Sequence, residues 1–426
     1  MKTLTPPTNL SQSSVAPRST SEIIHSYQKN IIPNYGRVPI ALVRGKGSYV
    51  WNAEGKRYLD FSSGIAVNTL GHCHPAITKA ITRQAKRLVH TSNIFYTEGQ
   101  EVVAERIIRE IGAGKSFFCN SGAEANEALF KFARKFGHDS GRFEILTTLQ
   151  SFHGRTMAGI SATGQDKVKK GFEPLVEGFR HVPYNDLEAM RQAIGKKTVA
   201  ILIEGIQGEG GIIPAHASYL LGLRKLCDEQ GLLLLMDAVQ CGMYRTGQFQ
   251  SYQRILGEQT KSFLPDGISM AKGIAGGLPM GAIWIRQPYQ DLLGVGSHGS
   301  TFGGNPLVCA AAMAVFKTIE KENLAENASQ QGTWLKTALQ ELKSPFVEEI
   351  RGLGLMIGIE LKKEIPLLQA PDKPPAALFV RKLHEKGLIT VVAGTHTIRF
   401  LPPLNITQNQ SAEAIKKMKQ ALQELH

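Results

Sequence analysis

Residues 219–240 read YLLGLRKLCDEQGLLLLMDAVQ, an amphipathic stretch followed by an apolar run that stops at an acid. The apolar residues of Tyr219–Gln230 follow a helical pattern, and Leu232–Asp237 is apolar up to its last residue. A short run without polar residues is typical of a strand that is covered on both faces. This helix–strand unit predicts an α/β protein with a mostly parallel sheet between layers of helices.

The same alternation recurs along the chain. A second helical pattern lies at Glu124–Phe136, and short apolar runs predict four more strands, at Ser116–Cys119, Phe143–Leu149, Val199–Glu204 and Ala282–Arg286. Strands that alternate with helices favour parallel pairing. Ligands of such sheets bind at the carboxyl ends of the strands. Polar residues that directly follow the predicted strands are therefore the candidates for a functional site.

The two ends of the chain have a different pattern. Residues 41–61 contain short strand-like runs, and the C-terminal part combines predicted strands at Glu348–Leu361 and Thr397–Leu401 with a helix at Ala377–Lys386. Ser411 is expected to cap a last helix. We expect both ends to form one smaller α+β unit. The predicted division is a disordered N-terminal extension over residues 1–21, a small domain over 22–68 and 310–426, and a large cofactor-binding domain over 69–309.

Length and composition narrow the class of protein. The chain has 426 residues, of which 42% are apolar and 20% charged, which excludes a charge-rich disordered chain. Lys and Arg exceed Asp and Glu by 49 to 36, and this net charge of +13 favours acidic ligands such as carboxylates and phosphates. Five scattered cysteines favour a reducing compartment, and no apolar run has the ~20 residues of a membrane span. We expect a cytoplasmic protein without a membrane partner.

Two candidate binding elements directly follow strands. Ser121, Gly122 and Ala123 stand between a strand and a helix whose first N–H groups lack internal partners, so they can hold a phosphate. Taken alone, these residues fit an ordinary helix cap better. Asp237 ends a buried strand without a neighbouring cation in the sequence and needs a partner, such as a protonated ring nitrogen. A structural ion pair or a helix cap explains Asp237 about as well.

Further candidates lie in three loops. Lys272 stands between apolar neighbours before a Gly-rich loop, and a desolvated lysine has a lowered pKa and forms Schiff bases. Phe152 could stack on a planar ligand, and Arg155 offers a fork for a carboxylate. Ser300 and Thr301 precede Gly-Gly, which suits a phosphate or a carboxylate. Each residue has an ordinary alternative in packing, a turn or a solvated surface, but together they form a consistent set.

These segments resemble the class III pyridoxal-phosphate aminotransferases. The resemblance runs from about Asn34 to the last helix, and it rests on long motifs in the right order, at Asn120–Ala128, Ser151–Thr156, Glu204–Gly211, Asp237–Gln240, Ala271–Gly273 and His298–Pro306. It implies the type I fold of pyridoxal-phosphate-dependent transferases, pyridoxal 5'-phosphate (PLP) as cofactor, no metal, and a homodimer with shared active sites. Within the family, the most similar enzymes act on N2-acetylornithine.

The resemblance also implies roles for the cofactor-binding residues. Lys272 would bind PLP covalently and carry the proton of the reaction, and Asp237 would pair with the ring nitrogen. Phe152 would stack on the ring, and Gln240 would contact the O3′ side of the ring. The phosphate would be held by Ser121, Gly122 and Ala123 and by Thr301 of the partner subunit.

For the substrates, the resemblance implies that Arg155 binds the α-carboxylate, with Ser300 nearby and Tyr35 as a further candidate contact. Glu209 and Arg399 resemble a gate. Glu209 would mask Arg399 for one substrate and free it to bind the α-carboxylate of glutamate or 2-oxoglutarate.

The expected substrates follow from Gly64, which stands where ornithine-specific relatives have a Tyr that recognises a free α-amino group. Gly64 leaves room for an N-acyl group, so the expected reaction passes the terminal amino group of N2-acetylornithine to 2-oxoglutarate, a step of arginine biosynthesis. N-succinylornithine, ornithine and an N-acylated intermediate of a lysine pathway are alternatives.

The sequence departs from the family pattern in three places. Ala238 replaces a Glu beside the expected ring acid, Gly205 replaces a Pro, and Tyr244 replaces a Gly near the active site. These changes bear on substrate preference and on full activity rather than on the fold.

Other motifs favour different functions. Ser269-x-x-Lys272 matches the nucleophile pattern of penicillin-binding enzymes, but the other motifs of that class are absent. Gly294–Gly299 matches a dinucleotide-binding fingerprint, but it follows a predicted helix and runs into a turn. Gly114–Ser116 matches part of a P-loop, but a predicted strand follows it where a helix is needed. His72–His74 is a weak metal motif. A basic binding protein that kept the fold and lost activity is the remaining alternative, although no Lys/Arg block indicates a nucleic-acid partner.

Overall fold

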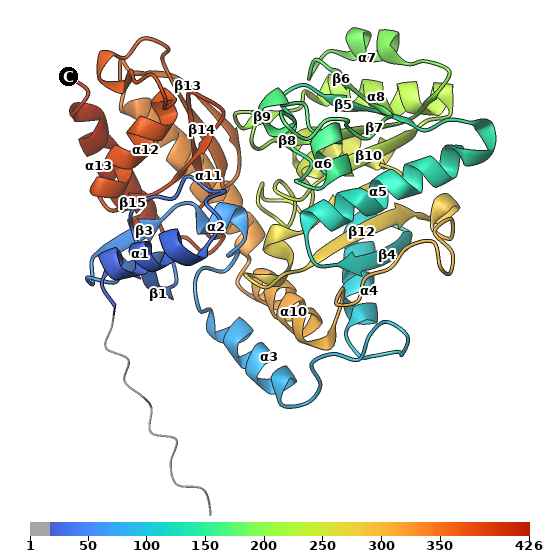
Figure 1. The fold of residues 1–426 in the computed structure, drawn as a ribbon, viewed down its shortest axis with the longest axis horizontal. Helices are drawn as coiled ribbons and strands as arrows, with labels where there is room; N and C mark the ends of the chain where they lie inside the picture. Colours follow the sequence, from blue (N-terminus) through green and yellow to red (C-terminus); the bar gives the residue numbers. More distant parts are fainter. Residues whose placement is uncertain (1–17) are drawn as a thin grey trace, which may run out of the picture.

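The computed structural model describes residues 18–426, which form two lobes (Figure 1). The middle of the chain makes the larger lobe, and the blue and red ribbons of the two chain ends lie together in the smaller one (Figure 1). Residues 1–17, most of the predicted disordered extension, lie outside the described residues. The first helix, α1 (Thr20–Asn30), begins inside the stretch predicted as an extension.

A seven-stranded sheet forms the centre of the larger lobe. Its strands follow the order β4-β12-β11-β10-β7-β5-β6, and β12 is antiparallel to both of its neighbours while the other described pairs are parallel. The bounds are β4 Gly114–Cys119, β5 Glu144–Thr148, β6 Phe179–Val182, β7 Thr198–Glu204, β10 Leu233–Asp237, β11 Gly267–Met270 and β12 Gly281–Arg286. The predicted α/β class with a mostly parallel sheet is confirmed.

The apolar run of β10 supplies both faces of this sheet. Leu233 and Leu235 belong to the core under α5 (Gly122–Gly137), whereas Leu234 and Met236 belong to the core on the side of α8 (Ala217–Gln230). Successive side chains of a strand point to opposite faces, so a strand between two helical layers needs apolar residues at every position. The continuous run in the sequence is thus explained by two cores rather than one.

Helices complete the larger lobe and connect it to the smaller one. They are α3 Pro75–Ala85, α4 Gln100–Ile111, α6 Met157–Ala162, α7 Leu187–Ala193, α9 Ser251–Leu256 and α10 Pro306–Lys321. Helix α10 packs against α3, α4 and α11. The predicted domain boundary at 309–310 falls inside α10, and the division into domains stays a prediction.

The smaller lobe contains two four-stranded sheets. One joins β1 (Leu42–Lys46), β2 (Tyr49–Asn52) and β3 (Arg57–Asp60) to the C-terminal strand β15 (Leu388–Ile389). The other has the order β13-β14-β17-β16, with bounds β13 Val347–Leu353, β14 Met356–Leu361, β16 Val391–Ala393 and β17 Thr397–Phe400. Its helices are α2 Ser63–Ala66, α11 Leu324–Glu341, α12 Pro375–Glu385 and α13 Gln408–Gln423. The expected α+β unit from both chain ends is confirmed.

One predicted cap was wrong. Ser411 lies inside α13 and is buried, where its hydroxyl donates to Gln331 at 2.9 Å. The helix begins four residues earlier, because Thr407 accepts from the N–H of Gln410 while the Gln410 side chain accepts from the N–H of Thr407. This reciprocal capping box satisfies two N–H groups at the helix start.

Candidate active site

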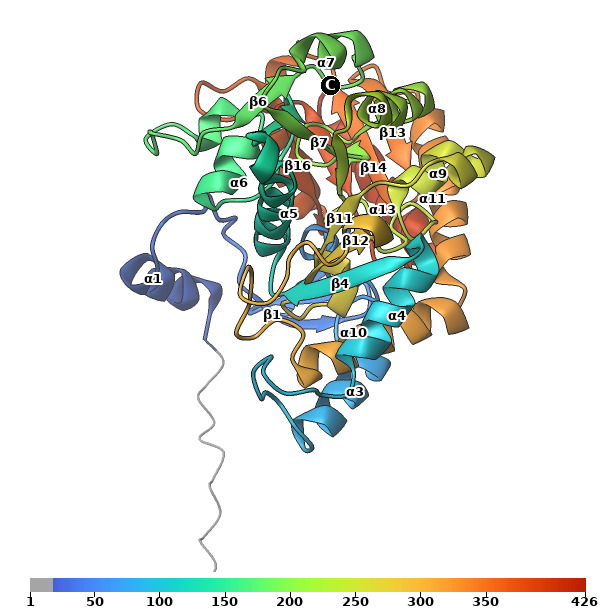
Figure 2. The same ribbon diagram turned by 90° about the vertical axis from the view of Figure 1, so that its right-hand side faces the viewer.

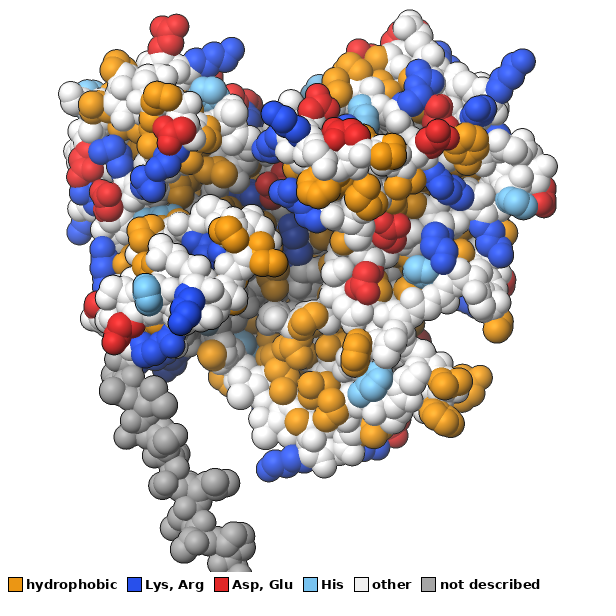
Figure 3. Space-filling model, in the orientation of Figure 1, with side chains coloured by type: hydrophobic (Ala, Val, Ile, Leu, Met, Phe, Trp, Pro, Cys, Tyr) orange, Lys and Arg blue, Asp and Glu red, His pale blue; other side chains and the backbone are white. Residues whose placement is uncertain are grey.

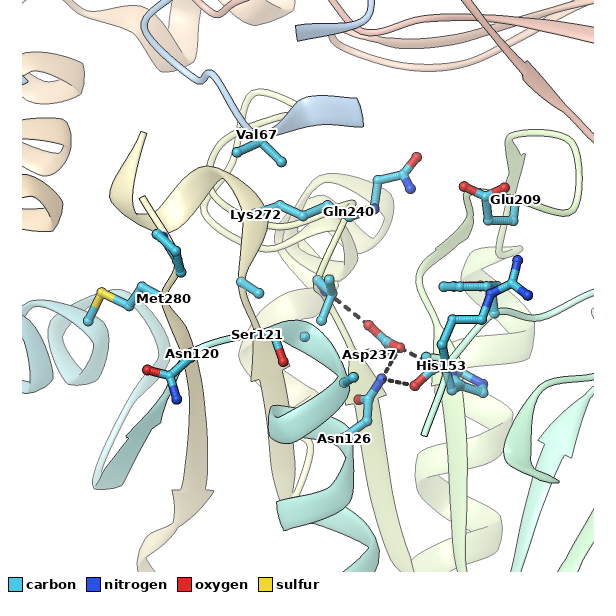
Figure 4. Close-up of a pocket in the computed structure, with 18 of the residues that line it drawn as sticks. Val67, Asn120, Ser121, Asn126, His153, Glu209, Asp237, Gln240, Lys272 and Met280 are labelled. Atoms are coloured by element: carbon cyan, nitrogen blue, oxygen red, sulfur yellow. Dashed lines mark hydrogen bonds and ion pairs between the residues drawn. The ribbon is translucent and has the colours of Figure 1, made fainter. Parts of the chain in front are cut away.

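A cavity of about 430 Å³ opens at the carboxyl ends of the parallel strands (Figure 4). The loops that follow β4, β5, β7, β10 and β11 all reach it, and β12 contributes its N-terminal side because it runs in the opposite direction. The predicted residues among its lining are Ser121, Gly122, Ala123, Phe152, Arg155, Glu209, Asp237, Gln240 and Lys272. The topology thus brings together residues that are far apart in the sequence.

The start of α5 forms one wall of the cavity. Ser121 caps the helix, since its hydroxyl accepts from the N–H of Glu124 at 3.2 Å. Gly122 packs so closely that a Cβ atom there would lie 2.6 Å from a methyl group of Val239. Only glycine allows this approach, and it turns the first N–H groups of a sixteen-residue helix towards the cavity.

Asp237 lies at the bottom of the cavity with both carboxylate oxygens engaged (Figure 4). One oxygen accepts from the Asn126 amide at 2.7 Å and lies 2.8 Å from the His153 ring, and the other accepts from the N–H of Val239 at 3.0 Å. Asp237 is 4% exposed. A buried carboxylate needs such donors, and together they orient it without neutralising it through a Lys or Arg ion pair.

The Asn126 side chain is fixed in turn by Ser269. The Ser269 hydroxyl donates to Asn126 Oδ1 at 2.6 Å, and the Asn126 amide group also donates to the His153 carbonyl at 2.9 Å. With its oxygen occupied by Ser269, Asn126 presents its NH2 group to Asp237. Ser269 pairs with Asp237 across the β10–β11 register, so a hydroxyl on the neighbouring strand sets the orientation of the amide.

Glu204 is a second buried acid beside Asp237. Its oxygens accept from the N–H groups of Phe152 at 3.1 Å and Gly208 at 3.0 Å. Burial and the nearby Asp237 raise the pKa of Glu204 to about 7. Two acids in one desolvated site repel each other when both are charged, and this repulsion opposes ionisation of Glu204.

Lys272 reaches the cavity from the loop after β11. Its φ of 46° lies in the left-handed region, which non-glycine residues rarely adopt. Burial, followed by the charge of Arg399, lowers the pKa of Lys272 to about 8. The uncharged, nucleophilic form of this amine is therefore far more populated near neutral pH than that of an ordinary lysine.

Arg399 lies behind the cavity wall, where it is almost fully buried. Its guanidinium donates to Gln240 at 2.8 Å, to Glu209 at 2.9 Å and to the Val392 carbonyl at 3.0 Å. Arg399 itself is not among the lining residues, whereas Gln240 and Glu209 are. The Glu209 carboxylate thus stands between Arg399 and the cavity.

Four predicted residues lie at the periphery. Arg155 is exposed at the cavity mouth, 5.5 Å above the Phe152 ring. Ser300 contacts the cavity only through Asn120, whose amide donates to its hydroxyl at 3.1 Å. Thr301 and Tyr35 are exposed and do not line the cavity.

The sequence pattern of the family described as "Aminotransferase class-III" matches residues 31–422 of this chain. The chain belongs to the class-III aminotransferases. It is 44% identical over 409 residues to an acetylornithine aminotransferase of Nostoc, which covers 93% of this chain and 92% of that one. An acetylornithine aminotransferase of Myxococcus xanthus is 43% identical, covering 91% of this chain and 94% of the relative.

Solved structures of the same fold agree. The ornithine aminotransferase of Toxoplasma gondii superposes with a TM-score of 0.89 at 29% identity, over 96% of this chain and 95% of that chain, and PLP partly occupies its active site. This class-III member is therefore an aminotransferase of fold type I whose cofactor is PLP.

The residues present fit PLP. The N-terminus of α5, where only glycine fits at position 122, suits the phosphate. The hydrogen bonds from Asn126 and Val239 hold the Asp237 carboxylate as an acceptor for the ring nitrogen. An amine with a lowered pKa faces the same cavity. The volume of about 430 Å³ lies within the range of small-molecule sites.

Sequence reasoning missed three residues of this site. Asn126, His153 and Glu204 lie within the family motifs, but nothing in those motifs indicates that their side chains surround Asp237. Asn126 follows Gly122 by four positions, so helical spacing places both on one face of α5 and could have indicated the contact.

The other motifs have structural explanations. His72 lies 2.7 Å from Asp60, and the described residues contain no cluster of metal ligands. Gly114–Ser116 is part of β4 rather than a nucleotide-binding loop.

Proposed function

We propose that this chain transfers the terminal amino group of N2-acetylornithine to 2-oxoglutarate, giving N-acetylglutamate semialdehyde and glutamate. The observation that carries the proposal is the likeness over nearly the whole chain to acetylornithine aminotransferases, at 43–44% identity. Gly64 supports the choice of substrate. It is exposed in the turn that leads to Val67 on the cavity wall, and its φ of 65° disfavours a larger residue.

The residues of the cavity divide the chemistry among them. PLP supplies an electron sink for the bond next to the reacting nitrogen. Asp237 would accept a hydrogen bond from the protonated ring nitrogen, and the contacts from Asn126 and His153 hold its carboxylate in place. The Lys272 amine, whose pKa is lowered to about 8 by burial, would in its uncharged form take the proton from the substrate carbon and return it to the cofactor side. No external oxidant is needed, because the amino donor becomes an aldehyde while the keto acid becomes an amino acid.

The carboxylates of the two substrates use different arginines. Arg155 at the cavity mouth suits the α-carboxylate of acetylornithine, whose reacting carbon carries no carboxylate. With this substrate the Glu209–Arg399 pair stays closed. 2-Oxoglutarate brings a carboxylate next to its reacting carbon, and that group requires Arg399.

We also propose a homodimer that completes the site. Thr301 is exposed and neighbours a set of exposed apolar side chains, which Figure 3 shows gathered on the part of the lobe that carries α3. The Asn93 amide donates to the carbonyls of Ser300 and Gly303 and ties this set to the Thr301 loop. Exposed apolar patches of this kind mark interfaces. The set comprises Leu88, Val89, Ile94, Phe95, Tyr96 and Phe302.

The cytoplasm is the compartment that we propose for the protein. All five cysteines lie in the described residues and are free. Within residues 18–426, no helix combines the length and the apolarity that crossing a bilayer requires. Free thiols favour a reducing compartment.

The visible spectrum of the purified protein tests the proposed function. The protein with PLP should absorb in the visible range, and acetylornithine alone should convert this band, which 2-oxoglutarate should then restore. A band that responds to glutamate but not to acetylornithine would reject the proposed substrate. Absence of any band after addition of PLP would reject the aminotransferase activity of this chain.

A further inference from the structure

Glu209 lies in a hairpin that reaches two cavities. It stands at the tip of a hairpin between β8 (Ile206–Gln207) and β9 (Ile213–Pro214), and Gly208, Gly210 and Gly211 flank it. Glycines make this backbone permissive, and Gly211 has a φ of 123°. Glu209 lines the cavity of Lys272, whereas the next residue, Gly210, lines a second cavity.

The second cavity lies between the two lobes and has a volume of about 1210 Å³. One wall comes from the loops after β5 and α6, and the other comes from β13, β14 and β17. Figure 3 shows a hollow between the lobes with Lys and Arg side chains along it. The cationic residues among its lining are Lys167, Lys169, Lys336 and Arg351.

Two of these cations already have acidic partners. The Arg351 guanidinium pairs with Glu349 at 2.7 Å and also with Glu360. The Lys169 amine lies 3.6 Å from Asp166. Both cations therefore already have at least one carboxylate beside them.

The remaining two differ in their surroundings. The Lys336 amine donates to the Gly352 carbonyl at 3.0 Å, which holds it against β13 on the wall of the cavity that the smaller lobe provides. Lys167 has no ion pair within 4 Å among the described residues, and its side chain is exposed to the cavity. Burial tends to raise the pKa of Glu209, but the charges of Arg399, Lys272 and, more weakly, Lys167 lower it. Lys167 lines the same cavity as Gly210, the residue that follows Glu209.

Glu209 needs a second position if 2-oxoglutarate is a substrate. The carboxylate of that substrate would take the place of Glu209 on Arg399, and the displaced acid would otherwise remain unpaired beside a second negative charge. We propose that Lys167 receives the Glu209 carboxylate when a dicarboxylate displaces it from Arg399, so that Lys167 determines specificity for the second substrate. This inference rests on the proposed function, because only a dicarboxylate acceptor requires the exchange.

The proposal separates the two half-reactions. Acetylornithine leaves the Glu209–Arg399 pair closed, so Lys167 has no part in its conversion. 2-Oxoglutarate and glutamate open the pair, so a neutral residue at 167 should weaken their binding. The effect should vanish when position 209 carries no charge that needs a receiver.

The test compares Lys167→Met with the matched control Lys169→Met, each in the native and in the Glu209→Gln background. Each half-reaction is followed separately through the visible absorption of the cofactor, and the dissociation constant of glutarate, a non-reacting dicarboxylate, is measured by calorimetry. We expect Lys167→Met to lower kcat/KM for 2-oxoglutarate about fivefold and to weaken glutarate binding by the same factor, the order of a partly exposed ion pair. Acetylornithine turnover and the Lys169→Met protein should be unchanged.

Three results would overturn the inference. The first is an undiminished effect of Lys167→Met in the Glu209→Gln background, because Lys167 would then contact the substrate directly. The second is an equal loss in both half-reactions, and the third is no loss in either. If the native protein ignores acetylornithine but converts glutamate, the proposed amino donor fails, while the role of Lys167 is still decided by the 2-oxoglutarate and glutarate measurements.

Discussion

Lys272 is held where a positive charge is unfavourable. Burial and then Arg399 lower its pKa to about 8, whereas Glu209 and Asp237 act in the opposite direction. The covalent reaction of the cofactor-free protein with PLP should therefore rise with pH and reach half its maximum near 8. The measurement is the modification of the Lys272 peptide after borohydride reduction, followed by mass spectrometry.

Arg399→Gln supplies the matched comparison. It removes a repelling charge and leaves Glu209 without its partner, so the midpoint for Lys272 should move to higher pH. A midpoint that stays in place, or that moves to lower pH, would contradict this account of the electrostatics.

Ser269 acts on the cofactor through Asn126. Ser269→Ala should leave the Asn126 oxygen without its buried donor, which costs about 1–3 kcal/mol in comparable cases, and should free the amide to turn away from Asp237. PLP affinity, measured by equilibrium dissociation, should fall roughly tenfold. Ser262→Ala, which removes an exposed hydroxyl, is the control and should bind PLP normally. Unchanged affinity in Ser269→Ala would show that Asn126 keeps its orientation without help.

Gly205, one of the departures from the family pattern, lets the end of β7 pack closely against the start of α9. Gly205 has no Cβ, and the Ser251 hydroxyl occupies that space: a Cβ at position 205 would lie 2.2 Å from its oxygen. Gly205→Ala should therefore destabilise the fold. The double variant Gly205→Ala with Ser251→Ala should recover part of the loss, with a coupling of about 1 kcal/mol or more in denaturant unfolding. Strict additivity of the two changes would contradict the fit.

Tyr244 is another departure that its surroundings explain. It has a φ of 61°, a conformation that costs a non-glycine residue about 1–3 kcal/mol. Burial, an edge contact with Phe249 at 5.3 Å and a hydrogen bond from Arg106 at 3.3 Å offset this strain. Ala238 is buried, and nothing in the structure explains its replacement of the family's Glu.

The elements with strong periodic patterns were predictable from the sequence. The runs at β5, β7 and β10 and the pattern of α5 carried enough signal. Strand β11 did not, because Gly267–Met270 contains a glycine and Ser269 within only four residues. The antiparallel direction of β12 depends on its neighbours in the sheet, which local periodicity does not encode.

The residues with a direct chemical role were predictable from their motifs, whereas the residues that only orient them were not. Asp237 and Lys272 stand out as polar residues after apolar runs. The contacts that orient Asp237 come from α5, from the loop after β5 and from β11, so they exist only once the sheet order is known. The Glu209–Arg399 contact spans 190 residues and joins the two lobes, and only the family resemblance indicated it.

At the scale of the whole molecule, the proposal is that a second copy of the chain completes the site. Thr301 is exposed and away from the cavity, and α1 has no buried residue and projects from the body (Figure 2). Both features are expected of a chain that packs against a second copy.

Subunit complementation tests whether the site is shared. Lys272→Ala removes the amine of a subunit's own site, and Thr301→Asp should place a negative charge beside the phosphate in the partner's site, so each homodimer should be inactive. In a mixed dimer, one site combines the intact Lys272 of one chain with the intact Thr301 of the other. If subunits exchange at random, half of the dimers are mixed and each has one good site of two, so activity should recover to about a quarter of the native value. The control mixes Lys272→Ala with Asn323→Ala, a change at an exposed residue. In this mixture only the sites that contain a native Lys272, about half of them, should be active. If the first mixture stays inactive although native mass spectrometry shows mixed dimers, each chain builds its site from its own Thr301.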